Sequence, residues 1–198
     1  FEKLREGDYL YVDKTALVWR IASTETPYFL SRPRRFGKSL LLSTFEAYFE
    51  GKKELFEGLA IADMEKEWKT YPVFHLDLNA EKYDSPQALV EILSRQLTQW
   101  ELKYGKGEDE ETLSGRFAGV IRRACEQSGR GVVVLVDEYD KPLLQALDDG
   151  TLLDDYRKTL KAFYGVLKSS DRYLRFVFLT GVTKFAQVSV FSDLNQLN

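Results

Sequence analysis

The stretch that most constrains the fold runs from Pro27 to Phe49, where an apolar run leads into a loop rich in Arg and Pro and Gly37-Lys38-Ser39 then begins a helical pattern. This order predicts a strand, a phosphate-binding loop and a helix. In such a loop the backbone N–H groups and the helix N-terminus surround phosphates, the lysine reaches the β- and γ-phosphates, and the serine hydroxyl binds magnesium. The expected phosphate-binding residues are Arg34, Arg35, Phe36, Gly37, Lys38, Ser39 and Leu40, with Ser39 also a magnesium ligand.

The loop departs from the usual pattern G-x-x-x-x-G-K-[S/T] at its first glycine, because Arg32 holds that position. Glycine permits a close backbone approach and unusual φ angles. Arg32 therefore predicts either a rearranged turn or a loop of a different shape. A nucleotide site then needs a second motif to support it.

That second motif follows about a hundred residues later, where the apolar run 132–136 ends in Asp137-Glu138. A continuous apolar run is typical of a parallel strand buried on both faces. Ligands of α/β sheets bind at the carboxyl ends of such strands. We expect Asp137 to hold the magnesium shell and Glu138 to orient and deprotonate a water for attack on the γ-phosphate.

Four blocks together resemble the AAA-ATPase-like proteins within the P-loop NTPases. They are residues 11–15 (YVDKT), 31–39 (SRPRRFGKS), 136–142 (VDEYDKP) and 179–185 (LTGVTKF). The resemblance implies that the Arg at position 32 is a family trait, and that Thr180 contacts the γ-phosphate or the attacking water as a sensor. It also implies that full-length members often continue into a region similar to PD-(D/E)XK nucleases. In related ATPases the region before the phosphate-loop strand packs beside adenine, so Tyr11 and Val12 are candidate base contacts; packing on the sheet edge is the alternative.

The expected fold is α/β, a P-loop NTPase three-layer sandwich with a mainly parallel sheet. Strands are predicted over 73–79, 132–136 and 175–180, and helices after Ser85-Pro86 to about Tyr104, from Thr112 or Ser114, and over 152–168. A strand inserted between the phosphate-loop strand and the Asp137 strand would define the additional-strand (ASCE, AAA-like) class. Residues 186 to 198 are expected to complete an edge and to leave no room for a C-terminal lid. We expect one domain over 1–198, part of a longer protein.

Composition limits the partners. The chain has 44% hydrophobic and 30% charged residues, a net charge of −3 and one cysteine, Cys125. This is an ordinary globular composition without a general basic footprint for nucleic acid. The single cysteine agrees with a reducing compartment, and we expect a cytoplasmic protein with no membrane partner.

Two polar residues on the strand 73–79 leave alternatives open. His75, the only histidine, is interpreted as structural because no Cys or second His lies nearby in the sequence. Asn79 at the strand's carboxyl end either restrains the catalytic Glu138, as AAA-type ATPases often do at this place, or is an ordinary turn residue.

These patterns predict ATP binding with Mg²⁺ and hydrolysis by in-line attack of water, assisted by Glu138 and by Lys38. The alternatives are a nucleotide-gated interaction module without significant turnover, and an ATPase that drives a C-terminal nuclease on DNA. ATP is favoured over GTP because no Asn/Thr-Lys-x-Asp guanine signature is present. An arginine finger would come from Arg34, Arg35, Arg172 or a neighbouring chain of a homo-oligomer.

Overall fold

A four-stranded, all-parallel sheet forms the centre of the computed structural model, which describes residues 1–7, 9–24, 26–79 and 82–183. The strands are β1 (Tyr28–Ser31), β2 (Val73–Asp77), β3 (Val132–Asp137) and β4 (Leu174–Gly181), in the order β1-β4-β3-β2. Strand β4, the last of the described strands in sequence, thus lies between β1 and β3. The predicted α/β class and parallel sheet are confirmed.

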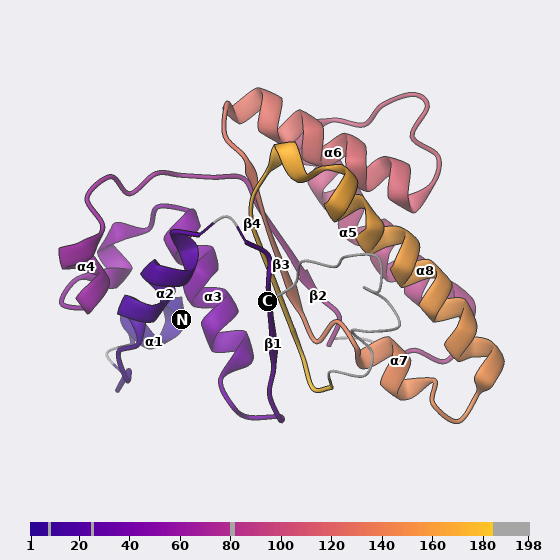
Figure 1. Ribbon diagram of the computed structural model, residues 1–198, viewed down its shortest axis with the longest axis horizontal. Helices are drawn as coiled ribbons and strands as arrows, with labels where there is room; N and C mark the ends of the chain where they lie inside the picture. The colour runs from indigo at the N-terminus through magenta and orange to yellow at the C-terminus, as the bar shows by residue number, and fades with distance from the viewer. Residues whose placement is uncertain (8, 25, 80–81, 184–198) are drawn as a thin grey trace.

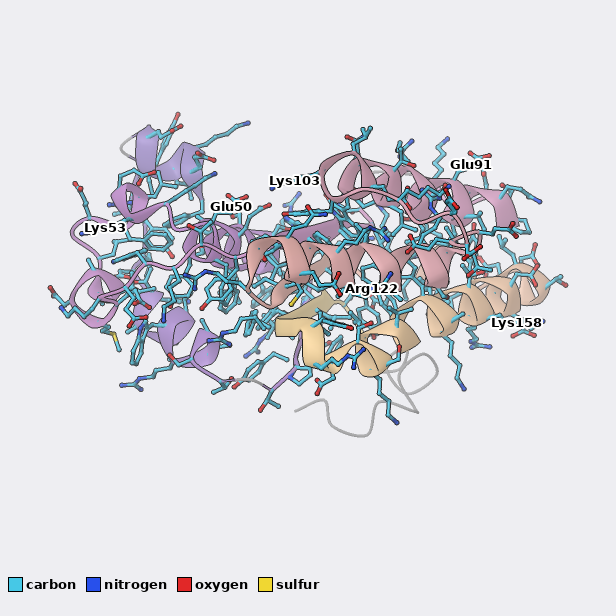
Figure 2. The ribbon with its side chains drawn as sticks, turned by 90° about the horizontal axis from the view of Figure 1, so that it is seen from above. Glu50, Lys53, Glu91, Lys103, Arg122 and Lys158 are labelled. Carbon is cyan, nitrogen blue, oxygen red and sulfur yellow. The ribbon has the colours of Figure 1, made fainter. Side chains whose placement is uncertain are left out.

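Helices cover both faces of the sheet (Figure 1). On one side lie α1 (Glu2–Glu6), α2 (Thr15–Ala22), α3 (Lys38–Phe49) and α4 (Ala60–Met64), and on the other α5 (Pro86–Tyr104), α6 (Leu113–Ser128) and α8 (Gly150–Ser169). The short α7 (Lys141–Gln145) follows β3, and 3-10 turns span Lys53–Phe56 and Asp171–Tyr173. Seen from above, charged side chains such as Glu91, Arg122 and Lys158 project from the helical layer that contains α5, α6 and α8 (Figure 2).

The central strands are apolar on both faces because both faces are covered. Along β3, alternate residues enter two different cores: Val132, Val134 and Val136 face α5, α6 and α8, while Val133 and Leu135 face the aromatic cluster around α3. This alternation follows from the two-residue period of a strand. It explains why the run 132–136 contains no polar residue.

Helix boundaries follow the capping signals in the sequence. The Ser85 hydroxyl accepts a hydrogen bond from the N–H of Ala88 and Pro86 occupies the first turn, while Thr112 caps α6 through the N–H of Gly115. The helices end at Gly105 and Gly129, which have φ of +86° and +65°. These starts and stops confirm the predicted helices to within one or two residues.

The YVDKT block has a structural role in the described residues. One carboxylate oxygen of Asp13 accepts hydrogen bonds from the backbone and hydroxyl of Thr15, at 2.8 and 2.6 Å. The other accepts from the N–H of Ala60, and the Thr15 hydroxyl accepts from the N–H of Ile61. The first N–H groups of a helix lack partners inside it. Asp13 and Thr15 therefore satisfy the start of α4 and fix it against α2.

The sequence prediction for residues 186 to 198, including the edge strand and the absence of a lid, falls outside the described residues. Within the described ranges, no helix combines the length and the apolar character that crossing a membrane would require.

Candidate nucleotide site

The phosphate-loop residues connect β1 to α3 at the carboxyl edge of the sheet. Gly37 adopts a left-handed conformation with φ of +76° and stands at the N-cap of α3, where it offers no side-chain hydrogen bond. A residue with a side chain would be strained there, which accounts for the glycine. The first N–H groups of α3, from Lys38 and Ser39 onward, have no partner inside the helix. They form an electropositive helix start that suits an anion.

Arg32 itself has no left-handed backbone conformation; in the loop 32–39 that conformation occurs at Arg35 and Gly37, with φ of +66° and +76°. The only non-glycine residues with positive φ among the described ones are Arg35, Trp68 and Glu138, so Arg32 has an ordinary backbone conformation. Its N–H donates to the carbonyl of Gly181 at 3.1 Å, and its side chain is exposed. Glycine's conformational freedom is therefore not needed at this position, which explains how an arginine can begin the loop.

Lys38 joins the phosphate loop to the acidic end of β3. Its ammonium group donates to the carbonyls of Arg32 at 3.0 Å and Pro33 at 3.2 Å, and pairs with the carboxylate of Glu138 at 3.0 Å. The Lys38 side chain is only 4% exposed and that of Glu138 14%. An ammonium has three N–H donors. All three have an acceptor here, so a phosphate that binds Lys38 must replace at least one of them.

Glu138 itself is held in an unusual backbone conformation, with φ of +52°. Such a conformation costs free energy in a residue with a side chain and tends to occur at functional sites. It follows directly after the buried strand β3, at the point where the chain turns toward α7. The turn directs the Glu138 carboxylate to the phosphate loop, as the 3.0 Å contact with Lys38 shows.

Asp137 and Thr180 form a buried pair beside this contact. The Thr180 hydroxyl donates to one carboxylate oxygen of Asp137 at 2.5 Å, and the two residues lie on neighbouring strands, β3 and β4. Thr180 is fully buried and Asp137 is 4% exposed. The hydroxyl fixes the orientation of the carboxylate. The hydroxyl of Thr180 is bonded to Asp137 in this arrangement. Its predicted contact with a γ-phosphate or water stays a prediction.

The donor set fits a magnesium ion bound mainly by water and phosphate. Among the residues that the structure describes, no group of three or more His, Cys, Asp or Glu converges on one point. Magnesium bound with a nucleotide commonly uses only one or two protein oxygens and keeps several waters. Asp137 and Ser39, an exposed residue in the first turn of α3, supply oxygens of the required type.

The other predicted site residues lie in different surroundings. Arg34, Arg35 and Phe36 are exposed, Phe36 by 67%, and Leu40 is half-buried in the first turn of α3. Tyr11 packs edge-on against Phe1 at 5.2 Å between ring centres and lies beside Thr44 of α3. The pKa of the Tyr11 hydroxyl is raised, mainly because the hydroxyl is partly buried. Val12 is 70% exposed. Both roles in base binding stay predictions.

Asn79 does not contact Glu138 in the described arrangement. Its side-chain and main-chain oxygens both accept hydrogen bonds from the ammonium of Lys141, the side-chain one at 2.8 Å. His75 on β2 pairs with Glu46 on α3 at 2.9 Å, and so serves to join the sheet to the helix that follows the phosphate loop. This placement agrees with a structural histidine.

Sequence reasoning assigned no role to Asp140, the fourth residue of the VDEYDKP block after Val136. It is completely buried and bonds to the residues that follow β4. The sequence signal for Asp140 is that it is the third acidic residue of the motif, two places after Glu138. Its partners could not be read from the sequence because they lie 42 and 43 residues away.

Comparison with known proteins adds the family. The family model described as "Predicted AAA-ATPase" matches residues 1–191. The chain belongs to this predicted AAA-ATPase family. Among curated proteins, the chain is similar to an uncharacterized protein from the vnfD 5′ region of Azotobacter chroococcum mcd 1, 42% identical over 199 residues. That match covers the whole chain but only 39% of the relative's length. No solved structure matches.

Family membership agrees with the resemblance inferred from the four motif blocks. It supports nucleotide binding in general terms and does not by itself assign a reaction, a metal or a partner. The chain spans well under half of its relative. The activity and partners of the longer protein are therefore matters for proposal.

Proposed function

We propose that this chain is the ATP-binding domain of a longer protein, that it binds Mg-ATP at the loop 32–39, and that it hydrolyses the γ-phosphate. The observation that carries the proposal is the 3.0 Å contact between Lys38 and Glu138. Two motifs a hundred residues apart in the sequence meet at one point, with Asp137 buried beside them. Strand β4 between β1 and β3 further supports the additional-strand type of P-loop fold.

The proposed roles follow from the position of each group. The loop N–H groups and the start of α3 would bind the phosphates, and Lys38 would exchange its Glu138 partner for phosphate oxygens. Glu138, released from Lys38, would accept a proton from the attacking water. Asp137, oriented by Thr180, and Ser39 would hold Mg²⁺. When bound, that ion would neutralise charge on the transferring phosphoryl group.

The exchange at Lys38 also favours a second candidate, the nucleotide-gated interaction module. If the phosphate takes the place of Glu138 on the Lys38 ammonium, and not that of the Arg32 or Pro33 carbonyl, nucleotide binding changes the contact between the phosphate loop and β3. A domain that uses this change to present a binding surface to a partner would not need to hydrolyse ATP rapidly. DNA as a partner, reached through a C-terminal nuclease-like region, and a homo-oligomer stay predictions. A cytoplasmic location and the preference for ATP over GTP stay predictions as well.

The deciding experiment measures two quantities on the full-length protein: Mg-ATP affinity by calorimetry, and phosphate release from labelled ATP, with and without DNA. The ATPase proposal expects binding together with release above the uncatalysed rate. Binding without release under every condition would favour the nucleotide-gated module. Absence of binding would contradict both. A dependence of release on DNA would support the partner prediction.

A further inference from the structure

The buried carboxylate of Asp140 makes contacts that the proposed reaction does not require. Its Oδ2 accepts hydrogen bonds from the N–H of Val182 at 3.0 Å, the N–H of Thr183 at 2.7 Å and the hydroxyl of Thr183 at 2.9 Å, and its Oδ1 accepts from the same Val182 N–H at 3.2 Å. Asp140 also occupies the N-cap position of α7, yet its side chain makes no capping bond there. An isolated buried carboxylate is costly. Its contacts are therefore directed to the segment after β4 and not to its own helix.

The same segment is bonded to the start of the phosphate loop on its other side. The Ser31 hydroxyl donates to the carbonyl of Val182 at 3.0 Å, and the N–H of Arg32 donates to the carbonyl of Gly181 at 3.1 Å. Residues 181–183 thus lie between Asp140, which follows β3, and Ser31-Arg32, which end β1 and begin the loop. The order β1-β4-β3 in the sheet makes this placement unavoidable.

Tyr139 and Gly181 show how closely the two segments approach. A Cβ atom on Gly181 would lie 2.4 Å from the Tyr139 ring and 2.8 Å from a carboxylate oxygen of Asp140, so no larger residue fits. The Tyr139 hydroxyl donates to the carbonyl of Thr183 at 2.8 Å, and its ring packs edge-on against Phe29 of β1 at 5.0 Å. The close contact leaves the 181–183 segment little freedom to move independently.

We propose that Asp140 is a positioning residue that sets the distance between the phosphate loop and the Asp137-Glu138 pair. The connection runs from the Asp140 carboxylate through the backbone of 181–183 to Ser31 and Arg32. This inference rests on the proposed function for its catalytic consequence. Its structural content, a transmitted constraint between two motifs, holds independently of turnover.

The physical reason is that two different parts of the domain would bind the phosphates and activate the water. The phosphates would be bound by β1, the loop and α3, whereas the water would be activated from the end of β3. Proton transfer needs hydrogen-bond distance between base and water. Loss of the Asp140 connection should therefore misplace Glu138 relative to the bound phosphates, while the phosphates keep the loop and Lys38.

The first arm of the test is hydrogen–deuterium exchange of the full-length protein, resolved by peptide, for the parent and Asp140→Asn. The amide keeps the size of the side chain but removes its charge, and its NH₂ group cannot accept the hydrogen bond that Oδ1 of Asp140 takes from the N–H of Val182. Exchange at Val182 and Thr183 should accelerate about tenfold, and the peptide containing Arg32 should follow. A peptide from α5 serves as an internal reference that should not change.

The second arm compares Thr183→Val, which deletes the hydroxyl donor, with Thr183→Ser, which keeps it. For Thr183→Val we expect kcat lower by about tenfold with KM for Mg-ATP changed by less than about threefold, and a smaller acceleration of exchange at Arg32. Thr183→Ser should restore the parental kcat and exchange. The pair also decides the matter where Asp140→Asn fails to fold.

Faster exchange at Arg32 in the variants, with kcat lost and KM kept, would support the proposal. Exchange that accelerates only at 182–183, or equal behaviour of Thr183→Val and Thr183→Ser, would overturn it. If the parent itself releases no phosphate, the hydrolysis proposal fails, and the exchange at Arg32 still decides whether Asp140 positions the loop.

Discussion

Replacing Glu138 by Gln should separate nucleotide binding from hydrolysis. The Lys38 ammonium and the Glu138 carboxylate lie 3.0 Å apart and are largely buried, and in the proposed mechanism ATP displaces this contact. A hydrogen bond to a charged group contributes about 1.5 to 3 kcal/mol, and a neutral amide keeps only part of it. Taking about 1.5 kcal/mol as the difference, the variant should bind Mg-ATP about tenfold more tightly than the parent.

The same substitution removes the proposed base. Single-turnover hydrolysis should fall by roughly two or more orders of magnitude, the scale of a general base. Calorimetry gives the affinity, and rapid-quench measurement with γ-labelled ATP gives the rate. The exposed residue Glu91 on α5 supplies the control, since Glu91→Gln should change neither quantity.

Two outcomes would refute this reasoning. Weaker ATP binding by Glu138→Gln would show that the carboxylate does not compete with phosphate for Lys38. Tighter binding with an unchanged rate would leave the competition intact but remove Glu138 from the role of base. If the parent protein hydrolyses no ATP under any condition, the result would favour the nucleotide-gated module.

The exposed arginines of the phosphate loop and the half-buried His75 give two further predictions. If Arg34 and Arg35 bind phosphates, the double Arg→Gln variant should weaken ATP by about tenfold or more and leave adenosine unchanged in a competition assay, whereas equal losses for both ligands would indicate structural damage. Burial lowers the pKa of His75, but its hydrogen bond to Glu46 and nearby negative charges outweigh this effect and raise the pKa above 6.5, while the hydrogen bond from His75 lowers the pKa of Glu46 below 4.5. The His75–Glu46 pair should therefore contribute its full stability between about pH 4.5 and 6.5 and lose it as pH rises through the raised His75 pKa. Chemical denaturation of the parent and of His75→Gln should then give a difference in the free energy of unfolding that shrinks above that pKa. A difference that grows with pH would contradict the assignment.

The sequence was most informative where a residue's role depends on its near neighbours. The α5 and α6 boundaries follow from Ser85, Pro86 and Thr112, each acting within three residues, and the double-sided burial of β3 follows from its unbroken apolar run. The meeting of Gly37-Lys38-Ser39 with Asp137-Glu138 could also be expected, since both stand at carboxyl ends of parallel strands.

What the sequence could not show were contacts fixed by sheet order. The hydrogen bond from Thr180 to Asp137 follows from the place of β4 directly beside β3, and the predicted contact of Thr180 with the γ-phosphate or water stays a prediction. Asn79 was considered for Glu138, yet Lys141, 62 residues away, binds it. The departure at Arg32 predicted a rearranged turn or a loop of a different shape, and the sequence could not show the ordinary backbone of Arg32 or its hydrogen bond to Gly181.

Calorimetric titration of Mg-ATP into the parent and Lys38→Ala tests the central claim most directly. Lys38 bears the buried ammonium between the phosphate loop and Glu138, so its removal should lower ATP affinity by about a hundredfold or more, while Lys158→Ala, on the exposed face of α8, should bind as the parent does. Because Lys38→Ala also leaves Glu138 and two carbonyls without their partner, a melting curve must accompany the titration to show that the variant is folded. Unchanged affinity in folded Lys38→Ala would contradict the assignment of loop 32–39 as the nucleotide site.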